Sequence, residues 1–267
     1  MSKITKITVQ QKNKARFNIF LDEEYAFAVY ESTLLKYQLA KGKELDELDI
    51  EEILFSDQVN KAYNAAVHYL SFRMRTEKEV VDYLKEKEYE GFVIKEIIVQ
   101  LKEQSYLNDK EFAIAYVRTQ VNTTLKGRGI IEQELLDKGV DKECATEVLE
   151  VEYALEKEVE HAVKLVIKYA PKYSRDSFKI MIQKVESALL RKGYSYSIIK
   201  LAIEEAELEQ DTSEEWEAIG KQAEKFHRKY KSLETYEYMM KMKGALYRKG
   251  FTIELIDKWL EEEGEKL

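Results

Sequence analysis

One feature constrains the fold more than any other: a short pattern typical of a helix end recurs four times along the chain. It occupies residues 83–88, 134–139, 188–193 and 245–250, and in the last three segments it closes on Lys-Gly. Glycine adopts the left-handed conformation that ends many helices, and a preceding Lys interacts favourably with the negative end of the helix dipole. In the first segment Glu88 stands in the glycine position, so we expect a different cap there. The pattern predicts four related helical units.

The spacing of the pattern sets the size of each unit. The leucine of each segment is followed, 51, 54 and 57 residues later, by the next one: Leu84, Leu135, Leu189 and Leu246. Such a spacing leaves room for three short helices per unit, and a unit of this size buries little surface alone. We therefore expect a mainly α protein, with the repeats supporting one another in an elongated, curved array. The predicted repeats are residues 58–107, 108–151, 152–208 and 209–267.

Composition agrees with a helical fold. The 267 residues include one proline and ten glycines, too few for the many turns of a β-sandwich or barrel. The single cysteine, Cys144, excludes an internal disulfide and a cysteine zinc cluster. With neither a signal peptide nor an apolar run long enough to span a bilayer, we expect a cytoplasmic protein without membrane contact.

The N-terminal segment, residues 1–57, differs from the repeats. Apolar residues alternate in three short runs, around Ile4–Val9, Phe17–Leu21 and Tyr25–Val29, separated by polar, turn-compatible segments. This pattern predicts a small antiparallel β-meander. Two short helices are expected after it, joined at Lys41-Gly42-Lys43, with a domain boundary near residue 57.

Charge is segregated along the chain, although the net charge is −8. Residues 163–200 carry a charge of +7 and residues 221–250 a charge of +6, whereas residues 201–220 hold eight acidic side chains and no Lys or Arg. Two series at i, i+4, i+8 spacing predict basic ridges on helices that could follow a phosphate backbone. The first is Lys164, Lys168 and Lys172; the second is Lys221, Lys225 and Lys229, with Arg228 beside it. The alternative interpretation is that both are solvated helix faces.

Four further basic residues stand at predicted helix joints. Arg73 and Arg75 precede Thr76, which begins a capping-box pattern, and could pair with internal acids or with a partner's carboxylates or phosphates. Lys126 and Arg128 lie in a glycine-rich basic segment that lacks the phosphate-loop pattern, which favours a helix joint with phosphate contact as a secondary role. The candidate binding residues are thus Arg73, Arg75, Lys126, Arg128, Lys164, Lys168, Lys172, Lys225, Arg228 and Lys229.

The sequence offers little for catalysis. His68, His161 and His227 stand in different repeats without metal-ligand spacing, and the many acids follow ordinary helical surface spacing. We expect no catalytic residue, no metal and no cofactor.

At this point the residues resemble a known family. The string Tyr69-Leu70-x-x-Arg73-x-Arg75-Thr76-x-x-Glu79-Val80-x-x-Tyr83-Leu84, then Leu101, Tyr106-Leu107-Asn108-Asp109-x-x-Phe112-Ala113 and Gly129-x-x-x-x-x-x-Leu135-x-x-Lys138-Gly139, is similar to the RecX regulatory proteins. The match is specific over residues 59–150. It resembles the longer Gram-positive type, with four repeats in place of three.

The resemblance implies a function in DNA repair, recombination and the SOS response. Family members are non-enzymatic modulators that bind the RecA–single-stranded-DNA filament and inhibit its ATPase, recombinase and coprotease activities; some also bind DNA. We therefore expect a monomer whose partners are the RecA filament and single-stranded DNA, with double-stranded DNA as a further DNA form to test. Two alternatives are a helical DNA-binding module that competes for DNA without touching RecA, and a helical scaffold for another protein. An enzyme, such as a metal-dependent nuclease, is the least favoured class.

Overall fold

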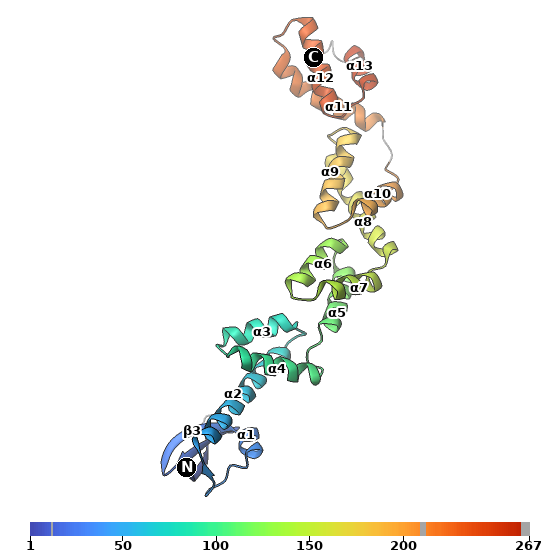
Figure 1. Ribbon diagram of the computed structural model, residues 1–267. Coiled ribbons are helices and arrows are strands. Elements are labelled where there is room, and N and C mark those ends of the chain that lie inside the picture. Colours follow the sequence, from blue (N-terminus) through green and yellow to red (C-terminus); the bar gives the residue numbers. More distant parts are fainter. Residues whose placement is uncertain (12, 209–211, 263–267) are drawn as a thin grey trace. The chain divides into compact units, whose positions relative to one another are not determined.

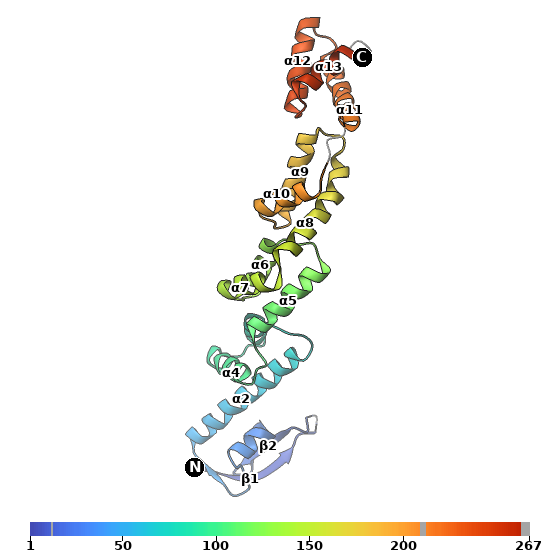
Figure 2. The same cartoon turned by 90° about the vertical axis from the view of Figure 1, so that its right-hand side faces the viewer.

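A computed structural model describes residues 1–11, 13–208 and 212–262 of the chain, and its helices and strands are shown in Figures 1 and 2. The chain divides into two compact units. The first comprises Met1–Ala113 with Asp137–Val140, and the second comprises Ile114–Leu136 with Asp141–Leu267. The described residues confirm a mainly helical protein of three-helix domains with an N-terminal antiparallel sheet.

The N-terminal sheet has four strands in the order β3-β2-β1-β4. The predicted meander is formed by β1 (Ser2–Val9), β2 (Arg16–Leu21) and β3 (Glu24–Tyr30). The two-residue β4 (Glu44–Leu45), which pairs with the start of β1, was not expected because it carries no alternating pattern of its own. A short helix α1 (Glu31–Lys36) follows β3, and the sheet and helices share a core that includes Ile4, Ile19 and Ile53.

The next helix, α2 (Glu47–Leu70), is much longer than predicted. It begins at Asp46 with a reciprocal capping box to Asp49, and no glycine or proline interrupts it for 24 residues. The expectation that the second helix is short is therefore wrong, and the predicted boundary near residue 57 falls inside α2. Figure 2 shows α2 leading from the sheet into the first three-helix domain.

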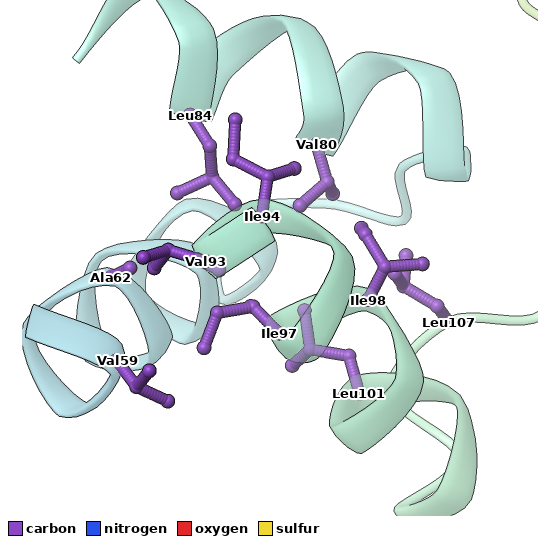
Figure 3. Close-up of a cluster of buried hydrophobic side chains, with 11 residues drawn as sticks. Val59, Ala62, Val80, Leu84, Val93, Ile94, Ile97, Ile98, Leu101 and Leu107 are labelled. Carbon is purple, nitrogen blue, oxygen red and sulfur yellow. The ribbon is translucent and has the colours of Figure 1, made fainter. Parts of the chain in front are cut away.

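In the first three-helix domain α2 packs with α3 (Glu77–Glu86) and α4 (Gly91–Glu103). Figure 3 shows its core, where Ile94 and Ile97 of α4 lie between the apolar faces of the other two helices. Thr76 begins α3 with the expected capping box to Glu79.

The remaining helices repeat this arrangement along the chain, and their bounds come from the same patterns of caps and apolar faces. The helices are α5 (Asp109–Thr123), α6 (Arg128–Asp137), α7 (Lys142–Glu152), α8 (Leu155–Tyr169), α9 (Phe178–Arg191), α10 (Tyr196–Glu205), α11 (Thr212–Tyr230), α12 (Thr235–Arg248) and α13 (Ile253–Glu262). Among the helices that the structure describes, none is long and apolar enough to cross a membrane. The predicted boundary between residues 208 and 209 touches residues outside the described part.

The Lys-Gly segments form a repeated junction between neighbouring helices. In the first unit the Thr76 hydroxyl donates a hydrogen bond to the Lys138 carbonyl over 2.6 Å. In the second unit the N–H groups of Gly127 and Gly129 donate to the carbonyls of Lys192 and Gly193. There, too, the Ser177 hydroxyl donates to the Lys249 carbonyl over 2.6 Å. Each junction joins the end of one domain's middle helix to the start of the middle helix in the domain before it.

The junctions give the glycines a second role. Gly139, Gly193 and Gly250 have φ values of +90°, +85° and +87°, and a Cβ atom at any of them would come within 2.6 Å of a junction residue. Glu88 adopts the same left-handed conformation, with φ of +63°, and its cap has the same hydrogen bonds, so the expectation of a different cap is wrong. A side chain is tolerated there because the described residues form no junction on the Lys87 carbonyl.

Candidate partner-binding surfaces

The predicted pair Arg73 and Arg75 is engaged inside the first unit. Arg73 donates to both carboxylate oxygens of Glu79, at 2.9 Å and 3.3 Å. Partial burial opposes ionisation of Glu79, but hydrogen bonds from Arg73 and the Thr76 N–H, with the charge of Lys138, lower its pKa below the usual value. The Arg75 guanidinium stacks on the Tyr69 ring at 4.1 Å. Both arginines thus stabilise the start of α3.

The predicted pair Lys126 and Arg128 is likewise engaged inside the second unit. Lys126 forms an ion pair with Glu134 at 2.5 Å. Arg128 pairs with Glu158 at 2.7 Å, and the Glu158 side chain is only 4% exposed. The Arg128 guanidinium also donates to the Tyr153 carbonyl. This segment is a helix joint held by a nearly buried carboxylate, and phosphate contact as its secondary role stays a prediction.

A polar network lies beside this joint. The buried Tyr153 hydroxyl donates to the Lys126 carbonyl and lies 3.1 Å from His161 Nδ1. The phenol oxygen and His161 Nδ1 share a hydrogen bond whose donor depends on the histidine tautomer. Burial, and then the charges of Lys157 and Lys164, lower the pKa of His161. His161 is therefore a buried, hydrogen-bonded interior residue.

The first basic ridge is shorter than predicted. Lys164 and Lys168 lie on the exposed face of α8, but α8 ends at Tyr169 because Pro171 has no N–H for the helix. Lys172 belongs instead to the short 3-10 helix η1 (Ala170–Tyr173), and its ammonium lies 5.1 Å from the centre of the Tyr169 ring. Lys164 donates to Glu160 over 2.6 Å.

Glu160 reduces the positive charge of the α8 ridge. Hydrogen bonds from Lys157 and from Lys164 lower the pKa of this exposed carboxyl to about 2. Glu160 therefore stays ionised at neutral pH and offsets one ammonium charge. Lys168 is exposed and has no ion pair with another described residue, so its charge is accessible to a partner.

The second ridge lies on the C-terminal half of α11. Lys225 and Arg228 are exposed, and neither makes an ion pair with another described residue. Lys229 lies 5.6 Å from the centre of the Tyr230 ring, whereas Lys221 pairs with Glu217 at 3.1 Å. The basic residues also interact favourably with the C-terminal end of the α11 dipole. The structure thus places six of the ten candidate residues on exposed faces of α8, η1 and α11.

Sequence reasoning missed the residues that fix the α6 joint. Glu158 looked like one more surface acid, and only its pairing with a residue 30 positions earlier identifies it as interior. Its position in the first turn of α8, on the same face as Ala162 and Leu165, was the available signal. Among the described residues no group of three His, Cys, Asp or Glu side chains is arranged to hold a metal ion.

Fold and surfaces together define a class of protein: an N-terminal sheet domain followed by three-helix domains linked by Lys-Gly junctions. Family models match almost all of this architecture. "Regulatory protein RecX N-terminal domain" matches residues 2–46, "RecX, first three-helix domain" residues 62–101 and "RecX, second three-helix domain" residues 108–149. The model of the third three-helix domain matches twice, over residues 156–203 and 213–260. The fourth repeat is therefore related to the third.

Relatives and a solved structure indicate the same family as the family models. The chain is 46% identical to "Regulatory protein RecX" of Bacillus subtilis over 260 residues, covering 97% of this chain and 98% of that protein. It is 45% identical to the protein of the same name from Listeria monocytogenes, with 97% and 96% coverage. A crystal structure of regulatory protein RecX shares 39% identity at a TM-score of 0.70, covering 76% of this chain and all of that one. The chain belongs to the RecX family of regulatory proteins and is a non-enzymatic regulator.

Proposed function

We propose that this protein binds the RecA–single-stranded-DNA filament in the cytoplasm and inhibits the ATPase, recombinase and coprotease activities of RecA. The family match over the N-terminal domain and all four three-helix domains carries this proposal. Family membership implies RecA regulation, and the mechanism proposed here is that a monomer occupies the filament and obstructs the steps that ATP hydrolysis accompanies.

The exposed residues of the two ridges are the proposed contacts with the filament. Lys168, Lys225 and Arg228 carry charges that no other described residue neutralises, so they are available to DNA phosphates or to acidic surfaces of RecA. Arg73, Arg75, Lys126 and Arg128 already have internal partners, so their proposed contribution is to hold the domains that present the ridges. The acidic segment between the ridges opposes indiscriminate coating of DNA.

The test is the single-stranded-DNA-dependent ATPase of RecA, measured with less than one molecule of this protein per RecA. We expect inhibition by the wild type, together with weak binding to bare single- and double-stranded DNA. The variant K168E/K225E/R228E should inhibit at least about tenfold less well, because three charges change sign. A matched control reverses three exposed lysines of the N-terminal domain, in the variant K3E/K14E/K41E.

Three results would contradict this proposal. Equal loss in both triple variants would show a general charge effect and remove the ridges from the mechanism. Inhibition that appears only when the DNA itself is saturated, with a steep salt dependence, would favour the DNA-binding module that competes for DNA. Neither inhibition nor DNA binding would favour a helical scaffold for another protein.

A further inference from the structure

The first three-helix domain has an apolar groove between α3 and α4 that the proposed function does not use. Its volume is about 550 Å³, and its lining combines an aliphatic floor with charged side chains. The floor is formed by Val81, Ile94, Ile98 and Val99, and the charged lining residues are Glu77, Lys85, Lys95 and Lys102. Ile94 and Ile98 also face the domain core in Figure 3, so the floor is anchored to rigid packing.

Comparison of the repeats within this chain shows that two residues of this floor, Val81 and Val99, have no apolar counterpart in the other three repeats. Counted from the glycine position of each repeat, Val99 corresponds to a glutamate in all three others: Glu150, Glu204 and Glu261. Val81 corresponds to charged residues as well: Glu132, Glu186 and Lys243. The sister repeats therefore show that this fold accepts charge at both positions. In the first repeat Val99 is instead 52% exposed, so apolar surface faces solvent where the sister repeats carry a charge.

The charged residues of the groove carry an excess of positive charge. Lys102 pairs with Glu77 at 2.5 Å, which neutralises both. Lys85 and Lys95 are exposed and form no ion pair with another described residue. Two uncompensated ammonium groups thus flank an aliphatic floor. Gly91 also lines the groove, and a Cβ there would meet no atom within 4 Å.

From these observations we propose that the groove between α3 and α4 binds an amphipathic helix of a protein partner, one whose apolar stripe is flanked by Asp and Glu. Such a helix presents aliphatic residues at positions i, i+3 or i+4 and i+7, which match an elongated apolar floor. Carboxylates on both sides of the stripe reach Lys85 and Lys95. Nucleic acid fits less well, because the floor lacks an aromatic ring on which a base could stack.

The inference is tested directly with a synthetic probe, so its outcome does not depend on RecA. The probe is a fluorescein-labelled helical peptide with a leucine stripe flanked by glutamates, and its binding to the full-length protein is measured by fluorescence anisotropy. A second peptide carries lysines in place of the glutamates, and a third carries serines in place of the leucines. We expect saturable binding of the first peptide and roughly tenfold or weaker affinity for the other two.

Variants of the groove residues test whether the acidic peptide binds in the groove. V81E/V99E gives the first repeat charged residues where its sister repeats carry them. This variant should lower the affinity for the acidic peptide roughly ten- to a hundredfold. V99S removes apolar surface without adding charge, and K85Q/K95Q removes charge without altering the floor; each should weaken binding by several-fold or more. V151S is the matched control, because Val151 of α7 is 74% exposed outside the groove, and it should bind like the wild type.

The inference would be overturned if the wild type did not bind the acidic peptide, or if V81E/V99E bound it as well as the wild type. It would also be overturned if V99S had no effect while K85Q/K95Q weakened binding to an oligothymidine, since the occupant would then be nucleic acid. These results leave inhibition of the RecA ATPase by the wild type unaffected. A failure of the groove is therefore distinguishable from a failure of the proposed function.

Discussion

The substitution G193A tests the inference that the junction glycines are required for space as well as for conformation. Gly193 has φ of +85°, and an added Cβ would lie 2.5 Å from the backbone nitrogen of Ile130. Gly42 has a similar φ of +99°, but its Cβ would meet nothing within 4 Å. G42A therefore isolates the conformational cost, whereas G193A adds the cost of opening the junction.

The magnitudes follow from the contacts. An alanine forced into the left-handed region costs about 1–2 kcal/mol, which is the whole effect expected for G42A. In G193A the start of α6 must also move away, which breaks the hydrogen bonds from Gly127 N–H to Lys192, at 2.8 Å, and from Gly129 N–H to Gly193, at 3.0 Å. Each contributes about 1 kcal/mol, so the local cost reaches about 3–4 kcal/mol.

Hydrogen–deuterium exchange measures this cost locally, which suits a chain whose domains need not unfold together. In G193A, amide exchange in residues 126–131 should become about thirtyfold faster, as expected from a loss of about 2 kcal/mol of junction hydrogen bonding. In G42A the same segment should exchange as in the wild type. Unchanged protection of residues 126–131 in G193A would refute the argument that the glycine is needed for close approach.

Three further predictions concern single residues. E88G should raise the free energy of unfolding by about 1 kcal/mol, because it removes a glutamate from the left-handed conformation. The urea midpoint should rise accordingly, and a lower midpoint would contradict this. E158A should destabilise the second unit by about 3 kcal/mol by leaving Arg128 without its nearly buried partner, while E160A, on the exposed face of α8, should leave the midpoint unchanged. Burial and two lysines lower the pKa of His161 below 6.5 in the folded state, so the unfolded chain takes up the proton first and stability falls as pH drops below 6.5. In H161N this loss should shrink, and an unchanged pH dependence would show that His161 is not its source.

Much of the fold could be predicted from local patterns. The Lys-Gly repeats, the capping box at Thr76 and the alternation in residues 4–29 identified the three-helix domains and the meander, because caps and periodicity depend on neighbouring residues. Features that depend on tertiary contacts could not be predicted in this way. The short strand β4 exists only because Ser2 and Lys3 pair with it, and α9 begins after Ser177, beyond the 3-10 helix η1 that follows α8.

The candidate site shows where charge patterns stop being informative. Helical spacing aligned Lys164 with Lys168, but the same spacing places Glu160 one turn before Lys164, where it forms an ion pair. A pattern of like charges therefore gives a ridge only after its neighbours are counted. Spacing says still less about Arg128, because its carboxylate partner lies 30 residues away. A basic residue is available to a filament only where folding leaves its charge uncompensated, and among the candidates with neither an ion pair nor a ring contact to another described residue these are Lys168, Lys225 and Arg228. Under the proposed function, mutagenesis of these three residues should weaken partner binding without changing stability, whereas mutagenesis of Arg73 or Arg128 should also change stability.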